Sequence, residues 1–129
     1  MITLDASVLV AHFGPQDAHH AAATRVLLDA AVADEALLLH SITLAEVLVG
    51  GTRIGRGPEM LADIQALGVE MARHDDGEPL RLAGLRATSG LKMPDCCVLD
   101  AALRHTTALA AFDHGLRTAA RRLGIAVVP

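Results

Sequence analysis

The sequence predicts an α/β fold in which helices cover both faces of a parallel central sheet. Short apolar stretches recur along the 129 residues, and the segments between them space their apolar residues as a helix does. Short apolar strands that alternate with helices are typical of parallel sheets buried on both faces. No linker or repeat divides the chain, so a single domain over residues 1–129 is expected.

The composition is that of a compact, soluble chain. Hydrophobic residues make up 52% of it, with Ala, Leu and Val dominant, and it has two Phe but no Tyr or Trp. No apolar run approaches the roughly 20 residues needed to span a bilayer, and the N-terminus lacks the basic region of a signal peptide. A cytoplasmic location and no membrane partner are therefore expected.

The helices and strands expected in the first half are inferred from apolar runs and from the residues that end them. An apolar strand ends at Asp5, and a helix begins near Ser7. The elements expected next are a helix over 17–35, a strand over 36–41, a helix over 42–55 and a helix over 57–68. Thr43 is a plausible N-cap of the helix over 42–55, and Gly50 and Gly51 lie near its end.

The second half repeats the alternation. Its expected elements are a strand over 69–73, a helix over 78–90, a helix over 94–106, a strand over 108–112, a helix over 115–124 and a strand over 125–129. Pro94 opens one of these helices. In sheets of this type ligands bind beyond the carboxyl ends of the strands, so functional residues are sought there.

The stretch "KMPDCCVLDAALRH" at 92–105 contains the only two cysteines, Cys96 and Cys97. Adjacent cysteines do not readily form a disulfide with each other, and two thiols fall short of a four-ligand zinc site. A catalytic thiol needs a partner base, and no motif places a histidine nearby. Inert, partly buried thiols are therefore expected.

Four carboxylates occupy poor positions for a merely solvated charge. Asp5 and Asp113 each follow an apolar strand, Glu46 lies among apolar residues in "TLAEVLVG", and Asp95 follows Pro94 at a helix start. Structural alternatives remain open, because Asp95 and Asp113 suit helix caps and Glu46 suits a solvated helix. Four converging carboxylates stay ionised only if cations compensate them, and oxygen ligands select Mg²⁺ or Mn²⁺ over zinc.

Four motifs in order carry a resemblance to a known family: "LDAS" at 4–7, "TLAEVLVG" at 43–50, "MPDCCVLDAA" at 93–102 and "FDHGL" at 112–116. The chain resembles PIN-domain ribonucleases over essentially its whole length, and within them the VapC toxins of type II toxin–antitoxin systems. The resemblance implies a three-layer α/β/α sandwich with a parallel central sheet. It also implies Mg²⁺-dependent endonucleolytic cleavage of RNA, which inhibits translation and growth.

The same resemblance implies roles for individual residues. The family's acidic site positions fall on Asp5, Glu46, Asp95 and Asp113. Asp5 and Asp95 are expected to hold Mg²⁺, or alternatively Mn²⁺, most directly, and the other two acids to complete the shell partly through water. Ser7 matches a hydroxyl that supports the first acid. The metal is expected to activate a water and to stabilise charge on the phosphate oxygens.

Two positions depart from the family pattern. Ala111 stands where a Thr or Ser is common, two residues before the last acid, so one polar supporter is missing. Asp100 stands where small apolar residues are common. At about 100° per residue it lies roughly 140° around the helix from Asp95, so we expect a surface or interface charge and not a fifth ligand.

Several basic side chains have open roles. His114 either assists protonation or is simply exposed at a helix start, while His19 and His20 are expected to be solvated helix residues. Three arginines on the helix after the last acid either grip phosphates or keep the helix soluble: Arg117, Arg121 and Arg122. With only Phe13 and Phe112 as aromatics, extensive base stacking is not expected.

The formal charge of −4, from 15 acids and 11 bases, argues against a nucleic-acid partner unless bound cations compensate the acids. The resemblance implies an RNA substrate, a homodimer, and a VapB-type antitoxin received by the surfaces around residues 42–67. Two rival interpretations are a catalytically degenerate PIN-like binding module and a phosphatase or phospho-acceptor domain. The second lacks support, because the chain has "DAS" in place of a DxD pair and its only lysine is Lys92.

Overall fold

A five-stranded parallel sheet organises residues 1–105 and 108–129, the parts of the chain that the computed structural model describes. Its strand order is β3-β2-β1-β4-β5, and every neighbouring pair runs parallel. The strands are β1 (Ile2–Leu4), β2 (Leu37–Leu39), β3 (Glu70–Met71), β4 (Ala108–Ala110) and β5 (Ala126–Val128). The helices are α1 (Ala6–Phe13), α2 (His20–Val32), α3 (Ser41–Arg53), α4 (Gly57–Gln65), α5 (Glu78–Ser89), α6 (Met93–His105) and α7 (His114–Arg122).

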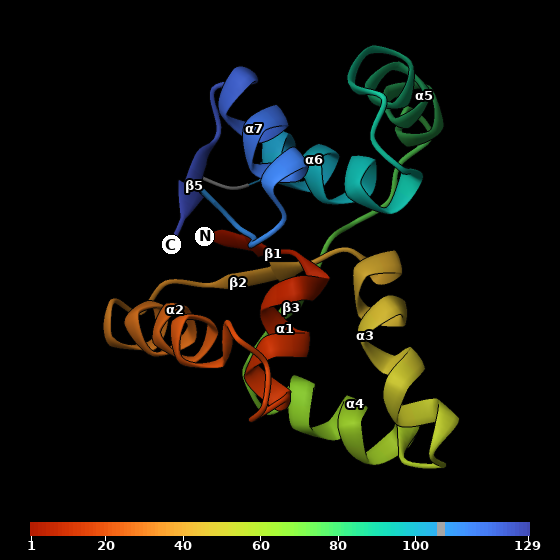
Figure 1. Ribbon diagram of the computed structural model, residues 1–129. Coiled ribbons are helices and arrows are strands. Elements are labelled where there is room, and N and C mark those ends of the chain that lie inside the picture. The colour runs from red at the N-terminus through yellow and green to blue at the C-terminus, as the bar shows by residue number, and fades with distance from the viewer. Residues whose placement is uncertain (106–107) are drawn as a thin grey trace.

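Helices cover both faces of this sheet, so the predicted three-layer α/β/α architecture is confirmed (Figure 1). Each expected element corresponds to one of these helices or strands, although residue 106 of the helix expected over 94–106 lies outside the described residues. Among the described residues, no helix combines the length and the apolar character needed to cross a membrane.

Two apolar cores lie on opposite faces of the sheet. In β4, Ala110 packs into a core with α1 and α2, while Leu109 packs into a second core with α6 and α7. This division follows from the strand geometry, because successive side chains of a strand point to opposite faces.

Two further helices extend the layers around the carboxyl edge of the sheet. The helix α3 contacts both α1 and α6, and α5 packs against α6. Through these contacts α3 brings a helical face close to the first turn of α6. The sequence-distant segments that contain Glu46 and Asp95 thus become neighbours.

The expected N-cap of α3 is wrong. His40 is the capping residue, and its Nδ1 accepts a hydrogen bond from the N–H of Ile42 at 3.1 Å. Thr43 is buried inside the helix, and its Oγ1 has no hydrogen-bond partner among the described residues. The helix also continues past the glycine pair, where Gly51 is buried against Met60 of α4. Capping preferences favour Thr over His, so the sequence pattern pointed to the wrong residue.

Two glycines of α5 provide a prediction about backbone conformation. Gly90 caps the C-terminus with a φ of 69°, whereas Gly84 lies inside the helix, and a Cβ added at either position meets no atom within 4 Å. We expect Gly90→Ala to destabilise the fold by about 1 kcal/mol, because an L-residue is strained in the left-handed region. The matched control Gly84→Ala should stabilise the fold by roughly 0.5–1 kcal/mol. Urea unfolding measures both, and equal effects would contradict the assignment of the cap.

Candidate functional site

Asp5 and Asp113 each follow a strand, and the two strands are neighbours in the sheet. β1 pairs with β4 so that Leu4 lies opposite Ala110, and the N–H of Asp5 donates to the Ala110 carbonyl at 2.9 Å. Asp5 caps α1, and Asp113 caps α7 by accepting from the N–H of Leu116 at 2.8 Å. Both acids therefore lie at the carboxyl edge of the sheet, where ligands of parallel sheets bind.

Ser7 holds the carboxylate of Asp5 in place. The Ser7 hydroxyl donates to Oδ2 at 2.6 Å and the Ser7 N–H donates to the same oxygen at 3.2 Å. The Ser7 oxygen also accepts from the N–H of Phe112 at 3.2 Å, which ties the carboxylate to the loop after β4. This contact agrees with the support expected of Ser7. Asp5 is only 7% exposed, and within the described residues no donor reaches its Oδ1.

Glu46 on α3 and Asp95 on α6 complete the group. Asp95 is the third residue of α6, so it lies in the first turn and not at the cap. Burial raises the pKa of Asp95, and the negative charges of Asp5 and Asp113 raise it further. The cation of Lys92 acts in the opposite direction. Burial also raises the pKa of Glu46, and the charges of Asp5 and Asp95 add to this effect. Repulsion therefore links the four carboxylates, because Asp5 and Asp95 act on Glu46 while Asp5 and Asp113 act on Asp95.

This arrangement has the chemistry of a site for divalent cations. Its donors are oxygen atoms only, and their mutual repulsion is relieved when a cation binds. Within the described residues, no three of the four acids place ligand oxygens all within 4.8 Å of one another. An ion here would keep several waters, as Mg²⁺ commonly does, and would contact some of the acids through them.

Sequence reasoning missed a second cluster, in which potential ligand atoms of His40, His74 and Glu78 all lie within 4.8 Å of one another. The Oε1 of Glu78 lies 2.8 Å from Nε2 of His40, and its Oε2 lies 2.6 Å from Nδ1 of His74. Because Nδ1 of His40 accepts from the N–H of Ile42, the proton of this ring sits on Nε2 and donates to Glu78. A metal on Nε2 would require the loss of that proton and of the α3 cap.

The second cluster is therefore a hydrogen-bonded connection between α3 and α5. Burial alone would raise the pKa of Glu78, but the hydrogen bonds from His40 and His74 outweigh it and lower the pKa. A buried carboxylate with this many donors is stabilised as an anion without any cation. Because His40 lies 38 residues from Glu78, no local sequence motif indicates the cluster.

The structure corrects the expected environment of Asp100. Asp100 is buried at 5% exposure, and its two carboxylate oxygens accept from Nε and Nη2 of Arg81 at 2.8 and 3.1 Å. Arg81 also forms two hydrogen bonds with Asp75, at 3.0 and 3.1 Å. Asp100 is thus not a fifth member of the acidic group, as expected, but it is no surface charge either. The helical angle correctly predicted that Asp100 lies on a different side of α6 from Asp95. Only the packing of α5 against α6 shows that Arg81 covers Asp100.

Arg117 has a structural role that the sequence left open. Its guanidinium donates to the carbonyls of Ala111 at 2.7 Å and Pro129 at 2.9 Å, so it links β4 to the end of the chain. These bonds use one N–H of each terminal nitrogen of the guanidinium. Arg121 and Arg122 of the same helix are exposed.

Of the two histidines near the start of α2, His19 is exposed as expected, whereas His20 is not. His19 is exposed but its ring stacks on Phe112, with centroids 4.4 Å apart and planes 6° apart. His20 is partly buried, and its Nδ1 lies 2.9 Å from the carbonyl oxygen of Ala11. His114 is exposed at the start of α7, in agreement with one of its two expected roles.

Both cysteines behave as the sequence predicts. Cys96 and Cys97 are free and buried. Burial raises the pKa of Cys96, and it raises that of Cys97 to about 11, with Glu78 and other nearby charges adding to the effect. Thiols with raised pKa values are poor nucleophiles at neutral pH, so the surroundings of both cysteines agree with the expectation of inert thiols.

Repulsion at the acidic group predicts that neutralising Glu46 stabilises the folded protein. We expect Glu46→Gln to raise the urea midpoint at pH 7 in EDTA, because the charged form of a group with a raised pKa is disfavoured in the folded state. The difference from the wild type should shrink as the pH falls through the raised pKa, where Glu46 itself becomes neutral.

Glu70→Gln is the matched control for this prediction, since Glu70 is an exposed glutamate on the edge strand β3. It should leave the midpoint near that of the wild type. A midpoint for Glu46→Gln that is unchanged or lower than in the control would show that the acids do not repel one another.

Comparison with known proteins places this geometry in a family. The PIN domain family matches residues 2–122. No curated protein sequence matches significantly. The fold is similar to the crystal structure of VapC20 from Mycobacterium tuberculosis, described as a Sarcin-Ricin loop cleaving toxin, at 20% identity and a TM-score of 0.66 over 92% of this chain and 95% of that one. It is also similar to FitAcB from Neisseria gonorrhoeae, at 21% identity and a TM-score of 0.69 over 100% of this chain and 97% of that one. With four acids at the carboxyl edge of a parallel sheet and this match over nearly its whole length, the chain belongs to the PIN domain family.

Proposed function

We propose that this chain is a metal-dependent endoribonuclease and the toxin of a type II toxin–antitoxin pair, which inhibits translation and growth. The observation that carries the proposal is a group of four carboxylates at the carboxyl edge of a PIN-family sheet, in which neighbouring acids raise the pKa values of Glu46 and Asp95: Asp5, Glu46, Asp95 and Asp113. The similarity to a structure described as a Sarcin-Ricin loop cleaving toxin supports RNA as the substrate.

Mg²⁺, or alternatively Mn²⁺, fits this group because all its donors are carboxylate oxygens. Asp5 and Asp95, which are less exposed than Glu46 and Asp113, would hold the ion most directly. The other two acids would contact it partly through water. When bound, such an ion activates a water and stabilises negative charge on the phosphate oxygens.

The protein itself orients two of the four carboxylates. Ser7 fixes one oxygen of Asp5, and the α7 cap fixes one oxygen of Asp113, so each carboxylate presents its remaining oxygen in a set direction. A preorganised site of this kind does not have to rearrange when charge develops on the substrate. Much of the rate enhancement of enzymes arises from such preorganisation.

The proposal includes protein partners and a cytoplasmic location. A VapB-type antitoxin would cover the apolar surface of α3 and the turn after it, where Ile42, Val49 and Ile54 are exposed at 44%, 45% and 72%. Exposed apolar side chains grouped along one helix are typical of a surface that receives a partner. A homodimer is also proposed, from the family resemblance.

RNA cleavage by the purified protein tests the proposal. We expect a labelled single-stranded RNA to be cut in Mg²⁺ or Mn²⁺ and to stay intact in EDTA. Asp5→Asn and Asp95→Asn should each lower the rate at least about 100-fold, because even changes outside the ligand shell of a metal cost about 10–100-fold. Asp63→Asn, which removes an exposed carboxylate of α4, is the matched control and should cleave at the wild-type rate.

Cleavage that persists in both variants would show that the acidic group is not the active site. A wild-type protein that cleaves no RNA with either metal would favour a degenerate PIN-like binding module.

A further variant tests the contact between Ser7 and Asp5. Ser7→Ala removes the donor at 2.6 Å from Oδ2, so we expect the Mg²⁺ concentration for half-maximal cleavage to rise by about 10–100-fold. Ser41→Ala, which removes an exposed hydroxyl from the first turn of α3, should leave the Mg²⁺ dependence unchanged. The same Mg²⁺ dependence in both variants would mean that Ser7 does not position a metal-binding carboxylate.

A further inference from the structure

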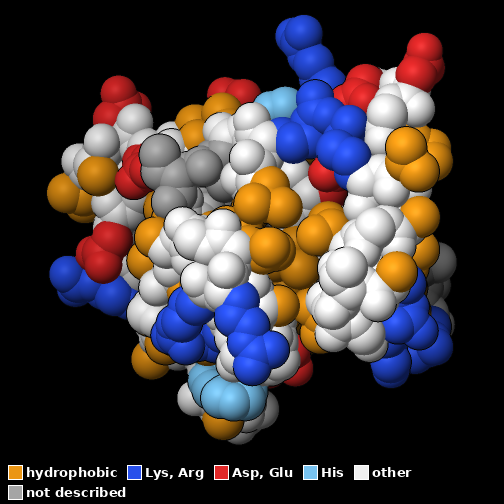
Figure 2. All heavy atoms as spheres, turned by 90° about the horizontal axis from the view of Figure 1, so that it is seen from above, with side chains coloured by type: hydrophobic (Ala, Val, Ile, Leu, Met, Phe, Trp, Pro, Cys, Tyr) orange, Lys and Arg blue, Asp and Glu red, His pale blue; other side chains and the backbone are white. Residues whose placement is uncertain are grey.

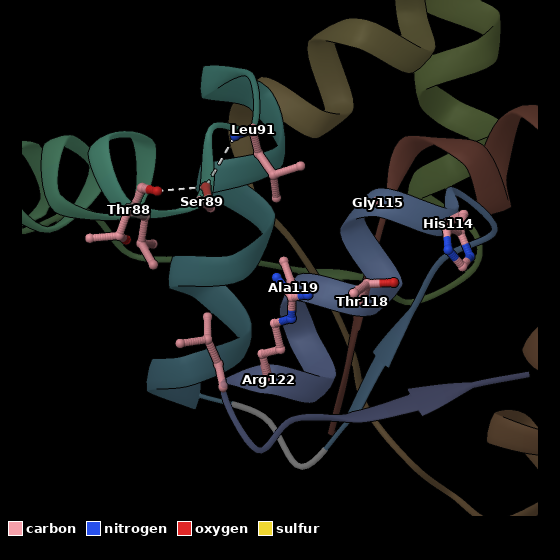
Figure 3. Close-up of a pocket in the computed structure, with 10 residues that line it drawn as sticks. Thr88, Ser89, Leu91, His114, Gly115, Thr118, Ala119 and Arg122 are labelled. Carbon is pink, nitrogen blue, oxygen red and sulfur yellow. Dashed lines mark hydrogen bonds between the residues drawn. The ribbon is translucent and has the colours of Figure 1, made fainter.

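A cavity of about 460 Å³ opens between the C-terminal part of α5 and the helix α7 (Figure 3). Its volume lies within the roughly 300–1,000 Å³ of sites that bind small ligands. Residues from α5, from the turn before α6 and from α7 line it: Leu85, Thr88, Ser89, Leu91, His114, Gly115, Thr118, Ala119, Arg122 and Leu123. None of these residues belongs to the four acids of the proposed active site.

The cavity lies next to Asp113, one of the four acids of the proposed active site. Gly115 lines the cavity and lies between the two, because a Cβ built on it would be 3.4 Å from Oδ2 of Asp113 and 3.7 Å from Cδ2 of Leu91. His114, which directly follows Asp113, lines the same edge (Figure 3). A molecule in the cavity would therefore lie beside the carboxylate of Asp113, with only a glycine between them.

The lining combines an apolar wall with a cation that has no partner in the part of the chain that the structure describes. Leu85, Leu91 and Leu123 supply aliphatic surface. Arg122 forms no hydrogen bond or ion pair with any described residue, in contrast to Arg81, which binds two aspartates. Thr88 donates its hydroxyl proton to the carbonyl of Gly84 at 2.9 Å, which leaves the lone pairs of its oxygen available to a donor.

The face of the molecule seen from above also carries both apolar and basic side chains. Seen from above, hydrophobic side chains gather near the middle of the molecule, and Lys and Arg side chains lie around them together with Asp and Glu side chains (Figure 2). A cavity with an apolar wall and a cation at its edge suits a nucleotide, since a base packs on the apolar wall and its phosphate binds the cation. Proteins recognise single-stranded RNA in this way, with bases splayed out of their stack.

We propose that this cavity is a substrate subsite that holds one unpaired nucleotide of the RNA next to the phosphate that is cleaved. The base would lie against Leu85, Leu91 and Leu123, and Arg122 would bind a neighbouring phosphate. This inference rests on the proposed ribonuclease function. It adds that the substrate is single-stranded at the cut, because a paired base does not enter a cavity of this kind.

A pair of adjacent arginines tests the role of the cation. Arg121 and Arg122 are both exposed on α7, but only Arg122 lines the cavity. We expect Arg122→Gln to weaken binding of a labelled single-stranded RNA several-fold in EDTA, as measured by fluorescence anisotropy. It should also lower the slope of log affinity against log salt by roughly 0.7, the contribution of one phosphate contact on a single strand. Arg121→Gln should leave the affinity and slope near those of the wild type.

A second pair tests the cavity itself without altering a native charge. Thr88 and Ala87 are adjacent exposed residues of α5, and only Thr88 lines the cavity. We expect Thr88→Glu to lower kcat/KM for cleavage of the single-stranded RNA several-fold by repelling the phosphate, with Thr88→Gln closer to the wild type. Ala87→Glu carries the same charge at the same end of α5 and should cleave normally. Circular dichroism establishes that all the variants are folded.

The outcomes separate this inference from the proposed function. If the wild type cleaves RNA but each variant behaves like its control, the chain is a nuclease and the cavity is not its subsite. If the variants bind and cleave RNA normally but no longer associate with a partner protein or a second copy of the chain, the occupant is a protein segment and the inference is wrong. If the wild type binds RNA through Arg122 but does not cleave it, the cavity binds RNA, but both the proposed nuclease activity and a subsite beside a cleaved phosphate are wrong.

Discussion

The parallel pairing of β1 with β4 is the contact on which the site depends. It places Leu4 opposite Ala110, so that Asp5 and the loop leading to Asp113 leave the sheet side by side. The Ser7 hydroxyl then connects these two segments, because it donates to Asp5 and accepts from the N–H of Phe112. A shift of this pairing by one residue would turn the core side chains to the wrong face and separate the acids.

The fold tolerates charge repulsion at this edge of the sheet. Burial and neighbouring anions raise the pKa values of Glu46 and Asp95, which means that their ionised forms cost stability in the folded chain. Such strain is characteristic of functional sites and is compensated by the apolar cores elsewhere in the molecule. In the proposed enzyme the compensating charge arrives with the metal ion.

Buried acids elsewhere in the chain show the opposite arrangement. Asp100 receives two hydrogen bonds from Arg81, and Glu78 lies at 2.8 and 2.6 Å from ring nitrogens of His40 and His74. Their donors belong to the protein itself, so they connect helices and need no ligand. Direct pairing with a basic side chain therefore distinguishes these structural carboxylates from the four acids of the proposed site, which form no ion pair with any described residue.

The sequence by itself determined the α/β class, the order of its elements and the edge of the sheet where acids gather, because these follow from local periodicity and from acids placed directly after apolar strands. It also marked Cys96 and Cys97 as inert, since their spacing suits neither a disulfide nor zinc. Only the tertiary structure decided the partners of side chains that meet from distant segments. The burial of Asp100 under Arg81 and the cap of α3 at His40 are two such cases. The cavity beside Gly115 is another, because its walls come from α5 and α7 and no local pattern encodes the space between two helices.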